Sequence, residues 1–277
     1  MSKPAFDSDG FQIILRSKKG KAKKLPQKDI TFVKENIEIN IPKARRYLQL
    51  NVKINFLGYV MFQYIFLLQA NFVVILKHKE VVEIVCFGLG HVGECLISQY
   101  QLALLLCTKE ALKLKKVSVH DPIFSTSECA LLKSLDINVI EENNEGSYII
   151  SKEGVTIVYL PHCPKQLTNN FIWSNWGSNL QNCILICNSF TSLIENQPSR
   201  LIKDIVPYIY KISSYTTEIN LENSFVHKDI FNDTSIHYFT KEKLDSVPSD
   251  FWVKQDKPTY ENTEEFITSL MVEKLTI

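Results

Sequence analysis

The sequence predicts an α/β domain in which helices cover both faces of a mainly parallel sheet, with peripheral N- and C-terminal extensions. Short and almost entirely apolar runs at 81–87, 155–160 and 183–187 are typical of strands covered on both faces. Segments of helical periodicity alternate with these runs, and right-handed connections then place the strands parallel to one another. With 277 residues, 45% of them hydrophobic, the chain can bury one sizeable core. We therefore predict a three-layer, Rossmann-like domain over residues 81–240.

Residues 1–50 are predicted to form a flexible basic N-terminal arm. A short alternating run at Phe11–Leu15 precedes a basic cluster at Arg16–Lys24. Such a cluster is either a solvated segment or a patch for nuclear localisation or for an anionic surface. The formal net charge of the chain is only +1, so the overall composition does not favour specific nucleic-acid binding.

Residues 51–80 form an atypical apolar segment. The stretch 54–76 carries no charge and is long enough to span a bilayer. Four of its side chains are costly to place in hydrocarbon, namely Asn55, Gln63, Gln69 and Asn71. Its β-branched and aromatic residues equally suit a buried helix or strand. We therefore expect no membrane partner. For the stretch 54–76 itself three interpretations stay open: a membrane segment, a buried helix and a gene-model artefact such as an inserted exon.

The first half of the predicted domain contains, in order, strand, helix, strand, helix and strand, at 81–87, 94–116, 117–120, 125–134 and 137–140. Lysines gather near the end of the first helix, where the helix dipole favours cations. Pro122 stops the second strand. Ser125 or Thr126 is the expected N-cap of the second helix, with Glu128 in its first turn.

The second half begins with a hairpin-like excursion around Gly154, formed by 148–151 and a buried strand at 155–160. It continues with a helix, a strand, a helix and two strand-like stretches, at 166–176, 183–187, 198–206, 208–219 and 235–239. Pro207 sets the end of the second of these helices, because proline cannot continue the hydrogen-bond ladder. Residues 241–277 are predicted to be a charged tail, helical over 254–277.

Seven cysteines are scattered along the chain, at Cys86, Cys95, Cys107, Cys129, Cys163, Cys183 and Cys187. Their odd number and apolar surroundings indicate reduced core thiols in a cytosolic protein. Because no C-x-x-C pair occurs, we expect no structural zinc site. The polar N-terminus lacks the apolar region of a secretory signal.

Polar residues and glycines follow four of the predicted strands. The carboxyl ends of parallel strands meet at one rim of a sheet, where open α/β sheets bind ligands. The candidate binding residues there are Gly88, Gly90, Asp121, His162, Cys163, Asn188 and Ser189. Three of the nine glycines lie within 88–93, where backbone N–H groups could approach a phosphate or another polar group. We predict a cofactor or small-ligand site at this rim.

Each candidate also has an ordinary structural interpretation. The glycine turn is either a ligand cradle or a tight connection, and Asp121 either binds a ribose hydroxyl or begins an Asp-Pro turn. Adjacent residues of an extended chain point to opposite faces, so His162 and Cys163 do not form a catalytic dyad. His162 alone could be an acid/base group or a metal ligand, Cys163 could offer a thiolate to haem iron, and both could simply be packed in a rigid loop. Asn188 and Ser189 could cap the following segment.

Seven short motifs occur in a distinctive order: Val85–Gly90, Gln99–Ala103, Asp121-Pro122, Leu160–Pro164, Asn175-Trp176, Asn188–Phe190 and Phe231–Ser235. In this order and spacing they resemble the Sensitivity to Red Light Reduced family over about 81–240. Asp9-Gly10-Phe11 and the basic stretch after it are similar to animal members. The family's turn usually holds only the glycines matching Gly88 and Gly90, and its region matching 54–76 is usually more polar.

The resemblance implies a regulatory protein of the cytoplasm, with the nucleus as a second location, associated with circadian rhythm regulation and haem biosynthesis. No established reaction comes with it. Our first hypothesis is therefore a regulatory protein that binds haem or another small ligand at the rim. The second is a nucleotide-cofactor-dependent enzyme, either a nicotinamide oxidoreductase or an adenosylmethionine-dependent transferase, with His162 as acid/base. The third is an interaction scaffold with a vestigial site, whose unidentified protein partners contact the basic arm or the tail.

Overall fold

The computed structural model describes residues 62–77, 79–223, 225 and 227–260, together with two short strands near the N-terminus. The chain divides into two compact units, Met1–Leu48 and Gln49–Ile277. In the first unit, β1 (Ala5–Phe6) pairs antiparallel with β2 (Gln12–Ile13). Four predicted features lie outside the described residues: the motif at 9–11, the basic cluster at 16–24, the start of the apolar stretch at 54–61 and the end of the tail at 261–277.

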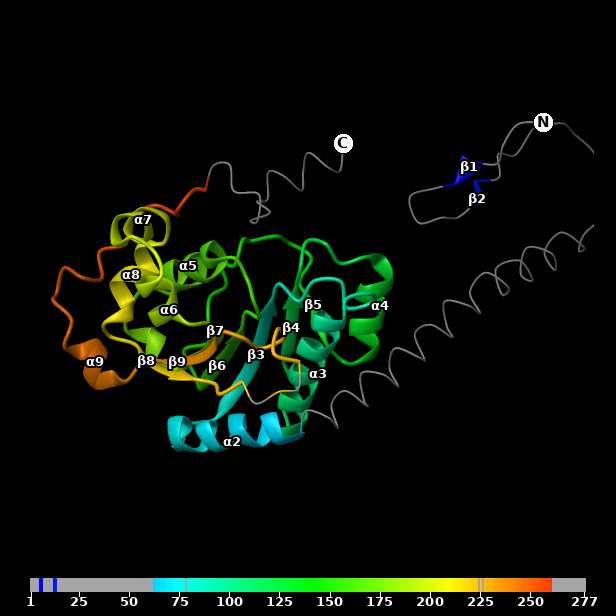
Figure 1. The fold of residues 1–277 in the computed structure, drawn as a ribbon, viewed down its shortest axis with the longest axis horizontal. Coiled ribbons are helices and arrows are strands. Elements are labelled where there is room, and N and C mark those ends of the chain that lie inside the picture. Colours follow the sequence, from blue (N-terminus) through cyan, green and yellow to red (C-terminus); the bar gives the residue numbers. More distant parts are fainter. Residues whose placement is uncertain are drawn as a thin grey trace, which may run out of the picture. The chain divides into compact units, whose positions relative to one another are not determined.

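A seven-stranded sheet forms the centre of the second unit (Figure 1). In chain order its strands are β3 (Val81–Phe87), β4 (Val117–His120), β5 (Asn138–Val139), β6 (Val155–Tyr159), β7 (Cys183–Asn188), β8 (Thr217–Asn220) and β9 (Thr234–Tyr238). Across the sheet the order is β5-β4-β3-β6-β7-β9-β8. Every pair from β5 to β7 is parallel, whereas β9 runs antiparallel to both of its neighbours. The predicted Rossmann-like fold with a mainly parallel sheet is thus confirmed.

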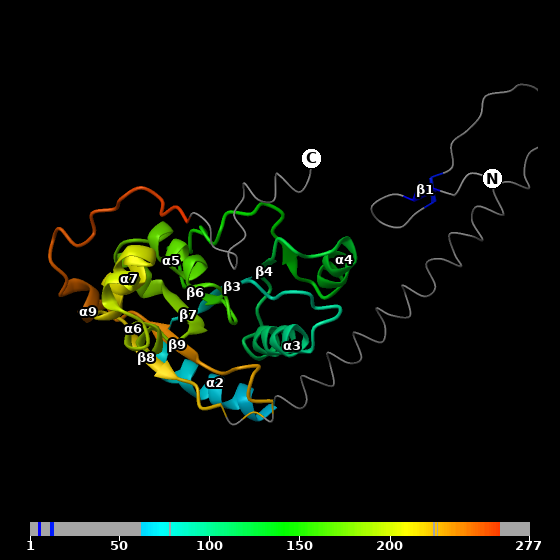
Figure 2. The same ribbon diagram turned by 45° about the horizontal axis from the view of Figure 1, so that its top comes forward.

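Helices cover both faces of this sheet, because alternate residues of each strand point to opposite faces. Val85 of β3 belongs to a buried cluster that includes Phe171 of α5 (Lys165–Ser174). Its neighbour Ile84 faces Leu104 and Leu105 of α3 (Leu96–Ala111) on the other side. Figure 2 shows α2 (Phe62–Leu76) on the side of α3, and α5 with α7 (Ser199–Ile205) on the opposite side. This is the predicted three-layer arrangement.

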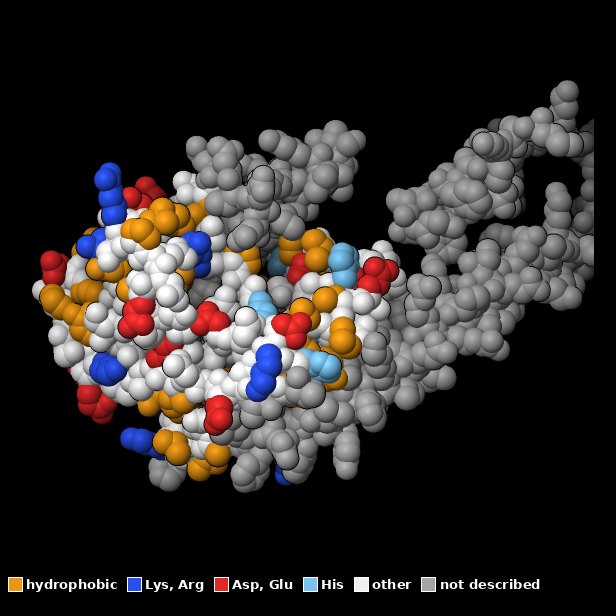
Figure 3. All heavy atoms as spheres, viewed as in Figure 1, with side chains coloured by type: hydrophobic (Ala, Val, Ile, Leu, Met, Phe, Trp, Pro, Cys, Tyr) orange, Lys and Arg blue, Asp and Glu red, His pale blue; other side chains and the backbone are white. Residues whose placement is uncertain are grey.

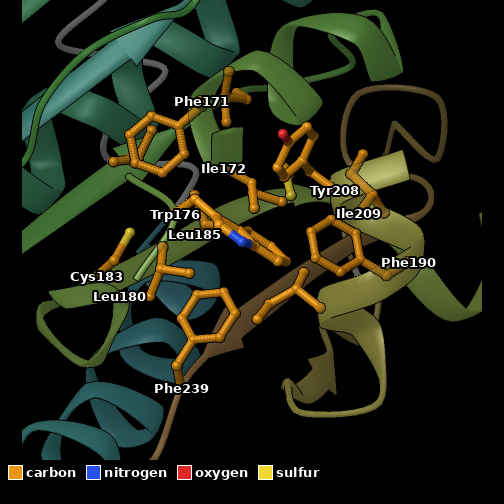
Figure 4. Packing of buried hydrophobic residues seen from close by; sticks show 14 of the residues in the cluster. Phe171, Ile172, Trp176, Leu180, Cys183, Leu185, Phe190, Tyr208, Ile209 and Phe239 are labelled. Atoms are coloured by element: carbon orange, nitrogen blue, oxygen red, sulfur yellow. The ribbon is translucent and has the colours of Figure 1, made fainter. Parts of the chain in front are cut away.

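Trp176 lies within the core on the α5 side (Figure 4). Its ring meets the Tyr208 ring edge-on at 4.9 Å and stacks on the Phe251 ring at 5.0 Å between centroids. Its indole Nε1 donates to the Phe251 carbonyl at 3.1 Å. Phe251 belongs to the stretch predicted as a charged tail, so that part of the tail packs against the domain.

The predicted elements of the first half agree closely with the structure. The strands at 81–87 and 117–120 have the predicted bounds, and α4 (Thr126–Ser134) begins as expected. Ser125 is its N-cap in a full capping box: Ser125 Oγ accepts from the Glu128 N–H at 3.3 Å, and Glu128 Oε2 accepts from the Ser125 N–H at 2.9 Å. The helix predicted to reach 116 ends earlier, at Ala111, because Lys113 takes a left-handed φ of 54°.

The stretch 208–219 was predicted as a strand, and this prediction is wrong. Its first part forms the helix α8 (Pro207–Ser213), and only Thr217–Asn220 is a strand. Pro207 occupies the first turn of α8, where its missing N–H costs nothing and its fixed φ suits a helix. Pro207 therefore ends one helix and starts the next.

Two further differences concern the second half. Residues 148–151, predicted as an arm of a hairpin, adopt no strand, and 254–260 contain no helix. Two further helices are not predicted from the sequence, because they are too short to show a helical period: α6 (Phe190–Glu195) and α9 (Lys241–Asp245).

The described part of the apolar stretch is the helix α2. Leu68 and Phe72, one turn apart, are buried, whereas Val73 and Val74 are 75% and 68% exposed. Among the described residues, none of the helices combines the length and the apolar character that crossing a bilayer requires. The predicted alternative was a buried helix, whereas α2 is buried on one face and exposes hydrophobic side chains on the other (Figure 3).

Candidate functional site

Two adjoining cavities lie at the carboxyl ends of the parallel strands. The first, which we call the glycine-turn cavity, has a volume of about 200 Å³ and is lined by residues after β3, β4, β5 and β6. The second, which we call the α6 cavity, has a volume of about 680 Å³ and lies between the β6–α5 loop, α6 and the loop before β9. His162, Cys163 and Pro164 line both, so this short loop separates the two cavities.

The two glycines of the turn after β3 are held in left-handed conformations, with φ of 73° for Gly88 and 71° for Gly90. A Cβ at Gly88 would lie 2.4 Å from Cys163 Sγ, and a Cβ at Gly90 would lie 2.9 Å from Ser98 Oγ. Position 88 therefore requires glycine both for its backbone conformation and for the close approach of the β6–α5 loop. Gly93 shows no such left-handed φ, in agreement with the family pattern of two glycines.

Asp121 links the turn after β4 to the glycine turn. One carboxylate oxygen, Oδ1, accepts from the Ile123 N–H at 3.1 Å, which is the Asp-Pro turn predicted as one alternative. The other oxygen, Oδ2, accepts from the Gly90 N–H at 2.7 Å. The residue is half-buried and lines the glycine-turn cavity, so its carboxylate also faces the predicted ligand position.

His120 precedes Asp121 and was not among the sequence candidates. It is 5% exposed and lines the glycine-turn cavity. Its Nδ1 lies 2.8 Å from the Ile140 carbonyl, which can only accept, so Nδ1 carries the proton and Nε2 is left as an acceptor. Nε2 is buried and has no hydrogen-bond partner among the described residues. A histidine at the end of a strand, next to a predicted site residue, is the sequence signal that could have identified it.

Glu128 ties the start of α4 to the glycine turn. Besides its part in the capping box, Oε1 accepts from the Gly93 N–H at 2.9 Å and Oε2 lies 3.3 Å from His91 Nδ1. Burial raises the pKa of Glu128, but the hydrogen bonds from Gly93, Ser125 and His91 outweigh it and hold the pKa below its usual range. The capping box was predictable from sequence, whereas the contact with the glycine turn depends on the fold.

The stability that Glu128 provides should depend on pH. Its pKa is lower in the folded than in the unfolded chain, so its contribution is present above the ordinary glutamate pKa of about 4.3 and is lost as the pH falls through the folded value. Glu128→Gln is expected to lower the free energy of unfolding by about 1 kcal/mol at neutral pH, and by less on acidification. Urea unfolding across pH measures this. Glu141→Gln, at an exposed ion pair with Lys133, is the control; a pH-independent loss in Glu128→Gln would contradict the assignment.

His162 lies exposed between the two cavities. Its φ of 50° is unusual for a residue other than glycine, and such strain is often found at functional positions. Its Nε2 lies 2.9 Å from the Asn232 carbonyl and therefore donates, so Nδ1 is the acceptor, with no partner among the described residues. This arrangement suits the predicted acid/base or ligand-contacting role.

The prediction for His162 and Cys163 assumed an extended chain, whereas the left-handed φ of His162 makes this loop a turn; the Cys163 thiol packs on the glycine turn. Its Sγ donates to the Phe87 carbonyl at 3.0 Å. Burial, followed by the Asp121 charge, raises the pKa of the Cys163 thiol. Because the thiol keeps its proton and serves as a packing contact of the glycine turn, the predicted thiolate for haem iron finds no support in this geometry.

Asn188 and Ser189 end β7, and only Ser189 is a cap. Ser189 Oγ accepts from the Ser192 N–H at 3.0 Å and caps α6, and the Ser189 N–H donates to the Asp233 carbonyl at 2.9 Å. Asn188 lines the α6 cavity. Its Nδ2 makes a long contact of 3.5 Å with the Cys163 carbonyl, and its buried Oδ1 has no hydrogen-bond partner among the described residues.

A buried polar group lies beneath this part of the rim. The His237 side chain is fully buried, with Nδ1 3.5 Å from Cys187 Sγ and Nε2 3.6 Å from Glu218 Oε1. Phe190 stacks on its ring with centroids 4.0 Å apart. Burial raises the pKa of Cys187 well above its usual range, so this cluster supports α6 and β9 and presents no nucleophile.

With this geometry in place, comparison with known proteins identifies the family. The family model described as the SRR1 domain matches residues 67–238. The chain belongs to the SRR1 family. This confirms the resemblance to the Sensitivity to Red Light Reduced proteins and places both cavities within the matched domain.

Relatives in animals and plants agree with this assignment. An SRR1-like protein of Mus musculus is 38% identical over 135 residues, 48% of this chain and 54% of that protein. An SRR1-like protein of Drosophila melanogaster is 31% identical over 194 residues, 69% and 67% of the two chains. Protein SENSITIVITY TO RED LIGHT REDUCED 1 of Arabidopsis thaliana is 25% identical over 175 residues, 60% and 62% of the two chains. The match thus spans about half the length of the mouse relative.

Two solved structures show a distant likeness to this SRR1-family chain. A crystal structure of a mutant of MtNAS matches with a TM-score of 0.41 and 13% identity, covering 74% of this chain and 73% of that chain. The plantazolicin methyltransferase BpumL, in complex with a desmethylPZN analog and SAH, matches with a TM-score of 0.29 and 12% identity, covering 76% and 90%.

Proposed function

We propose that this SRR1-family chain is a regulatory protein that binds a nucleoside-containing cofactor, of the S-adenosylmethionine type, in the glycine-turn cavity. The observation that carries the proposal is the pair of acceptors at the end of β4. His120 Nε2 is a buried acceptor with no partner in the part of the chain that the structure describes, and the Asp121 carboxylate lies next to it in sequence, on the wall of the same cavity. A buried unsatisfied acceptor is costly unless a donor reaches it, and ribose hydroxyls are such donors.

The position of the cavity supports a nucleotide-type ligand. From β3 the chain moves through β4 and β5 on one side and returns to β6 on the other, so the carboxyl end of β3 is the switch point of the sheet. Open α/β sheets bind ligands at this point, and an acidic residue after the second strand contacts the ribose.

The hydrogen bonds of the turn favour a nucleoside over a dinucleotide. A pyrophosphate needs free backbone N–H groups at the glycine turn. Here the Gly88 N–H donates to the His120 carbonyl at 3.0 Å, and the Gly90 and Gly93 N–H groups donate to the carboxylates of Asp121 and Glu128. These three donors are occupied, and the two carboxylates at the turn would repel a phosphate. The nicotinamide oxidoreductase alternative therefore has the weaker case.

Calorimetric titration of the full chain with five probes tests the proposal. We expect S-adenosylhomocysteine to bind, and NAD and haemin to bind at least about tenfold more weakly. Adenosine should bind more tightly than dideoxyadenosine, which lacks the hydroxyl donors for His120 and Asp121. Gly90→Val, which places a branched side chain at a left-handed position beside Ser98, should abolish binding. Asp245→Val, at an exposed site in α9, is the control.

Two results would contradict the proposal. Tighter binding of NAD would restore the dinucleotide alternative, and a Soret shift with haemin alone would restore the haem hypothesis. From the family resemblance we also propose roles in circadian rhythm regulation and haem biosynthesis, a cytoplasmic and nuclear location, and protein partners. In these regulatory roles the ligand site would sense the cofactor.

A further inference from the structure

The α6 cavity has a chemistry of its own, distinct from that of the glycine-turn cavity. It is the larger of the two described above, and its walls carry one cationic and one anionic side chain, Lys165 and Asp233. Neither takes part in an ion pair among the described residues. A cavity that keeps both charges apart is suited to a ligand that carries both charges itself.

One wall of the cavity favours an anion. Lys165 is the first residue of α5, and no side chain caps this helix. A cation in the first turn is unfavourable for a helix, because the dipole places partial positive charge there. A carboxylate bound here would accept from the uncapped backbone N–H groups and would offset the positive charge of the lysine ammonium.

The other walls favour a hydrogen-bond donor with positive charge. Asp233 lies exposed in the loop before β9, with a left-handed φ of 54°. Among the described residues, the side chain of Asn188, at the end of β7, makes a single long contact, from Nδ2 to the Cys163 carbonyl, and its Oδ1 has no partner. Asn188 and His162 line this cavity together, and an amide oxygen and the Nδ1 of His162 can both accept hydrogen bonds. All three groups accept hydrogen bonds, which is what an ammonium group requires.

We infer that the α6 cavity binds a small zwitterion of the amino-acid class. Lys165 and the start of α5 take its carboxylate, and Asp233 with Asn188 takes its ammonium group. His162 then stands between this ligand and the glycine-turn cavity. The evidence for this site does not depend on the glycine-turn cavity, and the zwitterion would be a second ligand of the protein.

Three probes with the same propyl group separate the charges of the ligand: norvaline, which has both, valerate, which has only the carboxylate, and butylamine, which has only the amine. We expect saturation-transfer NMR on the full chain to give a dissociation constant for norvaline at least about tenfold below those of the other two. Lys165→Met and Asp233→Asn should each weaken norvaline binding about tenfold or more. Lys115→Met, at an exposed lysine outside both cavities, should leave it unchanged.

The inference fails if norvaline does not bind, if valerate or butylamine binds as well as norvaline, or if the two cavity variants bind like the control. Gly90→Val separates it from the proposed function. That variant should lose S-adenosylhomocysteine and keep norvaline, whereas Asp233→Asn should keep S-adenosylhomocysteine and lose norvaline. Norvaline binding without S-adenosylhomocysteine binding would overturn the nucleoside proposal alone.

Discussion

Replacing Gly88 by alanine is expected to lower the free energy of unfolding by about 3 kcal/mol. Two costs add here. The left-handed φ of 73° is unfavourable by about 1–2 kcal/mol for a residue with a Cβ. The added Cβ would also lie only 2.4 Å from Cys163 Sγ, and such overpacking costs about 1–3 kcal/mol. Both neighbours are fixed, because the Gly88 N–H is bonded to His120 and the Cys163 thiol to Phe87. Urea unfolding followed by circular dichroism measures the loss.

Gly93→Ala is the matched control. Its Cβ would lie 3.4 Å from Glu128 Oε1, an ordinary contact, and no left-handed φ opposes it, so a change below about 0.5 kcal/mol is expected. A second variant separates the two costs. Combining Gly88→Ala with Cys163→Ala removes the steric clash but not the backbone strain, so the double variant should lose less than the sum of the single losses. Additive losses would show that the thiol does not oppose the added methyl group.

Asn169→Ala should cost a comparable amount, about 3 kcal/mol. Asn169 is fully buried in α5, and its Oδ1 accepts from the Tyr208 N–H at 2.9 Å and from the Ile209 N–H at 3.2 Å. In the first turn of a helix, backbone N–H groups have no partner within the helix. A side chain of α5 therefore caps the start of α8. Alanine leaves both groups buried and unpaired, at about 1–3 kcal/mol each.

Hydrogen exchange at Tyr208 and Ile209 gives the specific readout. Both amides should lose protection in Asn169→Ala before the rest of the domain unfolds, because the start of α8 is then uncapped. Asn179→Ala, at a half-buried asparagine outside this contact, should cost less than about 1 kcal/mol. Unchanged protection at the two amides would contradict the capping role.

This contact also explains why part of the fold could not be predicted from the sequence. Tyr208–Ser213 holds aromatic and β-branched residues that suit a strand, and its helical state depends on Asn169, some forty residues earlier in the chain. Local propensity carries no information on such a partner. By contrast, the strand at 81–87 and the start of α4 are specified by their own residues, through a buried apolar run and a capping box.

The candidate site shows the same division. Parallel topology alone brought Gly88, Asp121, His162 and Asn188 to one rim, because strand ends can be identified from the sequence. The direction of each side chain could not be derived in this way. Cys163 points into the packing of the glycine turn, whereas His120 leaves an acceptor in the cavity, and strand periodicity does not specify which nitrogen of a histidine is occupied.

The double use of Asp121 and Glu128 as anchors of the glycine turn has a further consequence for kinetics. Charge-assisted hydrogen bonds to these two carboxylates connect the glycine turn after β3 with the start of α4 and the turn after β4. Because the turn is fixed by the chain's own hydrogen bonds, we expect little conformational entropy to be lost when a ligand binds. Binding should then follow a single exponential whose observed rate rises linearly with ligand concentration, without the plateau that a slow loop closure would impose.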